Sequence, residues 1–195
     1  MRVGARVEPA RYNSLLDINV FGRRAGIAAA EYAARVSHPD LPDNPETTVV
    51  GMVSTLLEST GGERVASIRK ALQETMDRNA QVYRTDESLK QAEEDIAALK
   101  ARYASVAIGD KGKRFNSDLL EAIELGFLLD LAEVLVIGAR ARNESRGGHF
   151  REDYPNRDDV NFMRHTMAYR EDDGAIRLDY KPVVQTRYQP MERKY

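Results

Sequence analysis

The residues with the clearest chemical potential lie between Arg140 and Asp159, in the segment RARNESRGGHFREDYPNRDD. This segment contains five arginines, five carboxylates and one histidine, and no lysine. Arginine presents a planar guanidinium that pairs bidentately with carboxylates, whereas lysine is a flexible, strongly hydrated point charge. A solvated charge run ordinarily mixes the two. The arginine-only pattern therefore favours fixed geometry at an interface or an anion site, and Gly147-Gly148 permits a sharp turn.

His149 is the one histidine in a setting that could do chemistry, because Arg146 and Arg151 lie close to it in sequence. Neighbouring cations favour the neutral imidazole, so we expect a hydrogen-bond partner rather than a general acid. The sequence also leaves open a direct role of His149 at an active site. His38, beside a proline, is expected to be exposed, and His165 is expected to have a packing role in a strand.

Other motifs carry less chemistry. The loop at residues 109–113, GDKGK, resembles a phosphate-binding loop but lacks its spacing and its Ser/Thr, so a connection between helices is expected. The chain has no GxGxxG fingerprint and no cysteine, which excludes disulfides, thiolate nucleophiles and cysteine-ligated clusters in this chain. No histidines or cysteines stand at metal-ligand spacing, so no metal site is predicted.

Composition sets the class of protein. The 195 residues are 42% apolar and 31% charged, which is typical of a globular domain with a sizeable core. A net charge of −2 argues against a general nucleic-acid binder. The richest apolar stretch, residues 132–139, is too short to cross a bilayer, so any membrane association is expected to come through a partner. The absence of cysteine fits a cytosolic chain.

The pattern of apolar residues predicts a mainly α fold. Helices are expected at 13–36, 47–58, 63–83, 86–107 and 118–142, the last three on spacings of three and four. Helix 63–83 includes Tyr83 in its apolar stripe. Helix 118–142 is apolar almost all round and is expected to be central and buried. Gly22 and Gly26 lie four apart, which favours close packing of the first helix against another element.

These elements predict a three-helix bundle of spectrin-repeat type. It is preceded by one separate helix, and it is followed by a hairpin and an irregular tail. The hairpin strands, at 165–170 and 176–181, flank Asp172-Asp173-Gly174, a turn signal. The start of the first helix, residues 13–17, offers free backbone N–H groups and a positive dipole end. From the residues alone, a simply capped helix is favoured there over an anion site.

Three separated motifs resemble one known family. Residues 13–17, NSLLD, resemble the helix that closes the flavin-binding domain of the succinate dehydrogenase/fumarate reductase flavoproteins. Residues 144–153 resemble the family's ESRG-x-H-x-RED segment. The His165-Thr166 pair and residues 178–183 resemble its terminal strands. The motifs occur in the family's order and cover nearly the whole chain.

The resemblance implies oxidation of succinate to fumarate by FAD, with electrons passing to an iron–sulfur subunit. Ser14 and Leu15 match the positions whose backbone meets the isoalloxazine ring, so they are the predicted cofactor-binding residues. The helix start there would stabilise negative charge on the reduced flavin. The arginine-rich segment would help dock the helical domain on the flavin-binding domain and the iron–sulfur subunit.

The chain departs from the family just before residue 13. The family's substrate-binding segment reads His-Gly-Ala-Asn-Arg-Leu-Gly, and in register this sequence has Ala5 at the histidine and Pro9 at the arginine. Arg11 is offset by two positions. We therefore expect no catalytic residue in this chain, no retention of FAD by the chain alone, and no succinate oxidation without other polypeptides.

The predicted organisation has five parts. They are an irregular head (1–12), the terminal helix of the flavin-binding domain (13–36), a linker (37–46), the helical bundle domain (47–143), and the arginine-rich loop with hairpin and tail (144–195). The expected identity is a C-terminal fragment of a flavoprotein subunit at the inner face of the cell membrane. Two alternatives stay open: the C-terminal region of an L-aspartate oxidase, and a non-catalytic helical interaction module.

A frame error would account for the head. Codons for Ala-Asn-Arg-Leu-Gly-Thr can be chosen that, read two bases out of frame, encode Glu-Pro-Ala-Arg-Tyr, which are residues 8–12. Sequencing the DNA upstream of Asn13 tests this hypothesis. We expect the family's substrate-binding segment in another frame, and an intact, unrelated leader would rule it out.

Overall fold

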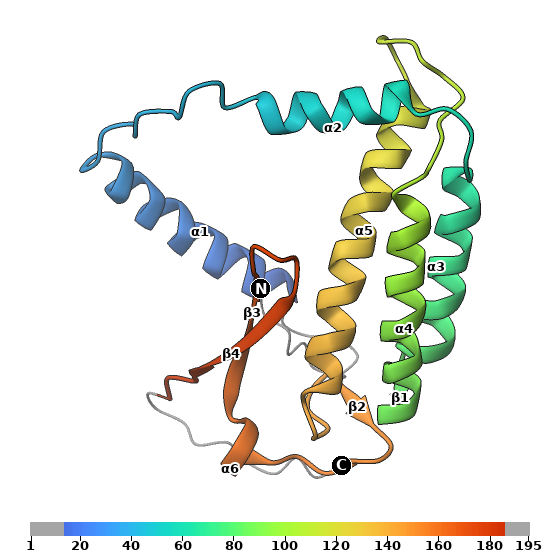
Figure 1. Ribbon diagram of the computed structural model, residues 1–195. Helices are drawn as coiled ribbons and strands as arrows, with labels where there is room; N and C mark the ends of the chain where they lie inside the picture. The colour runs from blue at the N-terminus through green and yellow to red at the C-terminus, as the bar shows by residue number, and fades with distance from the viewer. Residues whose placement is uncertain (1–13, 186–195) are drawn as a thin grey trace.

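The computed structural model describes residues 14–185 (Figure 1). The head, with Ala5 and Pro9, and the end of the tail lie outside the described residues. In chain order the elements are α1 (Ser14–Ala33), α2 (Thr47–Glu58), α3 (Val65–Asn79), β1 (Tyr83–Arg84), α4 (Asp86–Tyr103), α5 (Ser117–Arg140), β2 (Phe150–Arg151), α6 (Asp159–Phe162), β3 (Arg164–Arg170) and β4 (Ile176–Pro182). No helix within residues 14–185 is both long and apolar enough to cross a membrane.

Helices α3, α4 and α5 stand side by side and form the predicted three-helix bundle (Figure 1). Each contributes one apolar face to a single core, because apolar residues recur at helical spacing. Two of the three bundle helices begin with a side-chain cap: Thr85 and Ser88 form a capping box before α4, and the Asn116 side chain accepts from the Leu119 N–H at 2.8 Å before α5. The buried core residues include Ile68, Leu72, Leu89, Ile96, Leu99, Leu125, Leu129 and Val136.

The bundle helices are shorter than the sequence predicted. The helix expected to reach residue 83 ends at Asn79, so Tyr83 does not continue its apolar stripe. Tyr83 instead lies in β1, which pairs in parallel with β2, opposite Phe150. Its ring meets the Phe150 ring edge-on at 5.7 Å between centroids. This pairing with a distant segment, which helical periodicity does not record, determines where Tyr83 lies.

Helix α5 is not buried all round, and the prediction for it was wrong on this point. The face toward α3 and α4 is covered, and Leu125 and Leu129 there are fully buried. The opposite face carries a row of exposed apolar side chains. They are Leu120 (56% exposed), Phe127 (57%), Leu128 (42%), Leu131 (49%) and Leu135 (37%). We call this row the α5 outer face.

Helix α1 packs against little in this structure. Its residues from Leu15 onward are exposed, including Phe21 and Ile27. A Cβ placed on Gly22 or Gly26 would meet nothing within 4 Å, so the expected close packing there is not found among the described residues. Helix α2 crosses one end of the bundle near α5 (Figure 1).

The predicted hairpin is present. Strands β3 and β4 pair antiparallel, with Thr166 opposite Tyr180, and Gly174 supplies the positive φ of the turn at 86°. The hairpin is joined to α5 by Arg170, whose Nη2 lies 3.0 Å from Asp130 Oδ1 and 3.1 Å from Glu133 Oε2. His165 was expected to pack in the strand, but it is exposed.

Two glycines of α5 provide a matched test of bundle packing. A Cβ on Gly126 would lie 2.7 Å from the Tyr103 hydroxyl, which donates to the Ala122 carbonyl at 2.8 Å. A Cβ on Gly138 would meet nothing within 4 Å. We expect Gly126→Ala to lower the free energy of unfolding by about 1–2 kcal/mol and Gly138→Ala to raise it by up to about 1 kcal/mol. Urea unfolding measures both, and equal effects would contradict the packing described.

Candidate functional site

The arginine-rich segment folds into a compact loop where α5 ends, beside β1 (Figure 1). Gly147 takes a positive φ of 61°, and Arg146 and His149 exchange backbone hydrogen bonds of 2.8 and 3.1 Å across the turn. The glycine pair thus does make the sharp turn expected of it. Four polar side chains of this segment are buried: Arg142, Glu144, His149 and Arg151.

Glu144 is the centre of this loop, with no exposed surface. Its Oε1 accepts from the Arg142 Nη1 and from the Arg146 Nε at 2.8 Å. Its Oε2 accepts from the Arg146 Nη2 at 3.0 Å and from the Asp158 backbone N–H at 2.8 Å. A buried carboxylate is tolerated only when such donors replace its hydration. The two guanidiniums and the backbone N–H provide that replacement.

Arg142 joins this carboxylate to the hairpin. Its Nη1 donates to the Phe162 carbonyl at 3.0 Å, and its Nη2 donates to the Arg164 carbonyl at 2.6 Å. The Thr166 hydroxyl lies 3.4 Å from the same Nη2. One planar guanidinium thereby holds the connection between α6 and β3 against the loop that follows α5. The Arg142 side chain is only 7% exposed, so these contacts exclude water.

Arg151 joins the loop to the ends of two helices. It is fully buried, its Nη1 donates to the Arg140 carbonyl at the end of α5 at 3.0 Å, and its Nε and Nη2 pair with Asp153 at 2.7 Å each. Asp153 in turn accepts from the Asp86 backbone N–H at the start of α4 at 2.8 Å. A cation thus lies at a helix C-terminus and an anion at a helix N-terminus, where each is stabilised by the helix dipole.

His149 has both ring nitrogens occupied. Its Nε2 lies 3.0 Å from the Arg142 carbonyl, which can only accept, so Nε2 carries the proton. Its Nδ1 is then free to accept from Arg84 Nη1 at 3.2 Å. Burial lowers the pKa of His149, and the charges of Arg84, Arg151 and Arg142 lower it further. The predicted neutral state is confirmed, although burial outweighs the charges as its cause. This geometry gives His149 a structural role.

The arginine-rich segment therefore has the fixed geometry that its composition indicated, but the interface it forms is internal. Its charges form two neighbouring groups, Arg142–Glu144–Arg146 at the hairpin and Arg151–Asp153 at the ends of α5 and α4, which together we call the arginine clamp. Within residues 14–185 no group of three or more histidine or carboxylate side chains could hold a metal ion.

The glycine-containing loop at residues 109–113 connects helices, as predicted. Its backbone N–H groups face a carboxylate of the chain itself: Asp118 Oδ2 accepts from Gly109 at 2.8 Å and from Asp110 at 3.2 Å. These bonds lower the pKa of Asp118. Lys111 donates to the Ser59 carbonyl at 2.6 Å, so its ammonium holds α2 rather than a phosphate.

Ser14 and Leu15, the predicted flavin contacts, lie at the start of α1. The first N–H groups of a helix have no partner within it, and they face outward along the axis. The Leu15 side chain is 74% exposed. The arrangement fits one wall of a flavin site, since an exposed helix start can approach a ring that accepts negative charge. The sequence could identify these residues only through the family resemblance.

Removing the central charge of the clamp should be costly. We expect Glu144→Gln to lower the free energy of unfolding by about 3–5 kcal/mol, because it leaves two arginines without their buried counter-charge. Glu74→Gln is the matched control, since Glu74 pairs with Lys70 at 3.9 Å on an exposed helix face. Its effect should stay below about 0.5 kcal/mol. Chemical denaturation compares the two, and a small loss for Glu144→Gln would argue against the clamp.

The contribution of Asp153 to the free energy of unfolding should depend on pH. Its hydrogen bonds to Arg151 lower its pKa from 3.8 to about 2. A carboxyl whose pKa is depressed by folding stabilises the protein above its unfolded pKa, and this stabilisation is lost as the pH falls toward the folded value. Because the side chain is 29% exposed, we expect Asp153→Asn to cost only about 1 kcal/mol at pH 7. The difference between wild type and variant should disappear between about pH 4 and pH 2. A difference that is constant with pH would contradict this.

Known sequences resemble this chain over most of its length. The family model described as "Fumarate reductase flavoprotein C-term" matches residues 69–195. The fumarate reductase flavoprotein subunit of Mycobacterium tuberculosis is 43% identical over 94% of this chain and 33% of that protein. The succinate dehydrogenase flavoprotein subunit of Rickettsia bellii is 42% identical over 89% of this chain and 29% of that protein. The chain thus spans about a third of the length of these relatives.

Solved structures give the same result. A variant of Escherichia coli quinol fumarate reductase superposes with a TM-score of 0.83 at 39% identity, over 92% of this chain and 32% of that one. The Sdh1 complex of Mycobacterium smegmatis superposes with a TM-score of 0.80 at 29% identity, over 90% of this chain and 30% of that one. The resemblance predicted from three motifs is confirmed, and the chain belongs to the succinate dehydrogenase/fumarate reductase flavoprotein family, whose C-terminal helical domain it matches.

Proposed function

We propose that this chain acts as the C-terminal helical domain of a flavoprotein that interconverts succinate and fumarate with FAD. In this proposal the electrons pass to an iron–sulfur subunit. The observation that carries the proposal is the 43% identity to a fumarate reductase flavoprotein subunit over 94% of the chain. Similarity this high over an entire bundle and hairpin indicates that the faces used by such a subunit are present here.

The flavin contact is assigned to the start of α1. Bound FAD supplies the hydride acceptor, and this chain contributes the backbone N–H groups of Ser14 and Leu15. A helix N-terminus carries partial positive charge, so it stabilises the negative charge that reduction places on the ring. The 195 residues contain no dinucleotide fingerprint, so FAD is assigned to a site completed by a flavin-binding part outside them and is not expected to stay with these residues alone.

The docking surfaces are assigned to the exposed apolar faces. Monomeric proteins seldom leave a long apolar row such as the α5 outer face in contact with water, and α1 adds further exposed apolar side chains. We assign these faces to the flavin-binding part of the protein. The arginine-rich segment would contribute only its outward side to docking, including Tyr154, which is 42% exposed. The guanidiniums of Arg142, Arg146 and Arg151 are already committed inside the chain.

The other proposed partners are those expected of a flavoprotein subunit of this family. The iron–sulfur subunit is the proposed electron acceptor, and membrane attachment would come through partner subunits at the inner face of the cell membrane. No nucleic-acid partner is proposed, because the net charge is −2. The solved relatives named as a quinol fumarate reductase and an Sdh1 complex support an assignment to a multi-subunit oxidoreductase.

The chain alone should be inactive. We expect purified protein mixed with FAD and succinate to show no bound-flavin spectrum and no reduction of an acceptor dye, because no described element cradles the nucleotide. Absorbance spectroscopy after gel filtration measures the first, and dye bleaching measures the second. Stoichiometric flavin binding by the chain alone would contradict the proposal.

Reconstitution tests the assignment of Leu15. The chain would be co-expressed with the flavin-binding part of the M. tuberculosis relative, and dye reduction by succinate would be measured. Leu15→Pro removes one backbone N–H at a position in the first turn where proline is tolerated, whereas Leu15→Ala keeps it. We expect the proline variant to lose roughly ten- to a hundredfold in rate and the alanine variant to lose little. Equal rates would exclude a role for this N–H.

A further inference from the structure

Arg164 differs from the arginines of the clamp. No residue in the described part of the chain accepts a hydrogen bond from its guanidinium or forms an ion pair with it, and its Nε is buried without a partner. Its backbone carbonyl accepts from Arg142, so the position of the residue is fixed although no anion within residues 14–185 pairs with its guanidinium. A buried donor without a partner is costly and therefore needs an explanation, of which a bound group is one.

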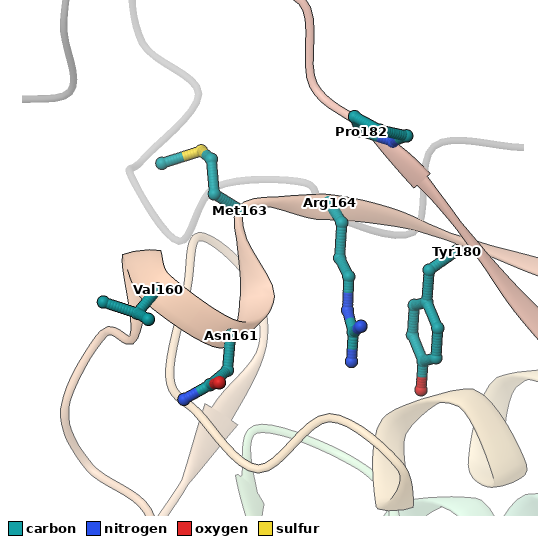
Figure 2. Close-up of a pocket in the computed structure, with 6 residues that line it drawn as sticks. All are labelled: Val160, Asn161, Met163, Arg164, Tyr180 and Pro182. Carbon is teal, nitrogen blue, oxygen red and sulfur yellow. The ribbon is translucent and has the colours of Figure 1, made fainter.

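Aromatic rings hold the Arg164 side chain in place. Its Cζ lies 3.5 Å from the centroid of the Tyr180 ring and 5.4 Å from that of Phe162. Figure 2 shows the guanidinium and the Tyr180 ring lying side by side. Stacking of this kind engages the face of the guanidinium and leaves the edge formed by the Nη1 and Nη2 N–H groups able to donate in the plane of the group. The edge is therefore oriented before any ligand arrives, which lowers the entropic cost of binding.

A cavity of about 330 Å³ lies at this side chain, where α6 meets the hairpin (Figure 2). Its other lining residues are Val160, Asn161, Met163, Tyr180 and Pro182. Polar groups come from Arg164, Asn161 and Tyr180, and the rest of the lining is apolar. The nearby carboxylates have other partners: Glu144 binds Arg142 and Arg146, and Asp158 binds Asn161 at 2.7 Å. Arg164 thus gives the cavity a positive charge that no carboxylate within residues 14–185 balances with an ion pair.

We propose that this cavity is a binding site for a carboxylate attached to an apolar group, with Arg164 as its anchor. The N–H edge of a guanidinium matches the two oxygens of a planar carboxylate. The apolar lining favours a ligand that carries methylene or larger apolar groups beside the acid. The site is formed by α6 and the hairpin and takes no residue from α1, so it is distinct from the proposed flavin contact.

Two sources could supply that carboxylate. One is a small free acid such as succinate, and the other is an acidic side chain of a polypeptide lying on this surface. The experiment separates them by using acetate, succinate and the blocked dipeptide acetyl-Leu-Glu-amide, with acetyl-Leu-Gln-amide as its uncharged match. All titrations are made at constant ionic strength, balanced with sodium chloride.

The readout is the Nε–H signal of Arg164 in protein labelled with ¹⁵N-arginine, assigned by its loss in Arg164→Lys. We expect a saturable shift of this signal, with a dissociation constant on the order of millimolar and at least about tenfold weaker binding in Tyr180→Leu. Tighter binding of the acidic dipeptide than of succinate would identify a polypeptide as the source. Similar or tighter binding of succinate would identify a free acid.

Arg69 is the internal control. Its Nε is also buried without a partner, but its Nη2 already engages the Glu121 carbonyl at 3.2 Å and the Glu124 carboxylate at 3.7 Å. Its signal should stay unchanged throughout. If the Arg164 signal does not saturate with any carboxylate, or if both arginine signals move together, the proposed site is excluded.

Discussion

The hydrogen bonding of the buried Glu144 carboxylate is the interaction on which the arrangement of the loop after α5, of α6 and of the hairpin depends. Removing such a group from water costs several kcal/mol, and the cost is offset only when its oxygens are fully hydrogen-bonded. Two arginines and one backbone N–H meet that requirement. Because a guanidinium is planar and rigid, the position of Glu144 also fixes Arg142 and Arg146. These in turn hold the hairpin and α6.

The described part of the chain buries charged groups and exposes apolar ones. The guanidiniums of Arg142 and Arg151 and the carboxylate of Glu144 are buried and join elements that are distant in sequence. The apolar residues of α1 and the α5 outer face point to solvent instead. In an isolated globular protein the reverse distribution is expected. This inversion is explained if the chain is one part of a larger flavoprotein, in which the clamp keeps the domain rigid and the apolar faces contact the remainder.

The sequence predicted the positions of the helices and strands better than it predicted which of their side chains are covered or paired. Periodicity located the bundle helices because each has one buried face, and the Asp172-Asp173-Gly174 turn located the hairpin. Periodicity could not place Tyr83, since its pairing with Phe150 joins residues far apart in sequence. It also could not show that one apolar side of α5 stays exposed, because sequence reports hydrophobicity and not what covers it.

The same limit applied to the candidate site. Composition indicated that the arginines have fixed geometry, yet it could not identify their partners, which depend on how the loop folds back on α5 and the hairpin. The neutral state of His149 was predictable from its neighbours, whereas its burial was not. Arg164 gave no signal in the sequence, because its chemistry depends on two aromatic rings brought together by tertiary structure.

Hydrogen exchange of the backbone amides in the arginine-rich loop tests the central claim most directly. In the chain alone, the amides of Arg146, His149, Arg151 and Glu152 are hydrogen-bonded although the loop has little regular secondary structure. An internal clamp predicts that these amides are already protected, and that adding the flavin-binding part of a relative slows exchange in α1 but not in the loop. Rapid exchange of the loop in the isolated chain, with protection appearing only on addition of that partner, would show instead that the segment is a docking surface.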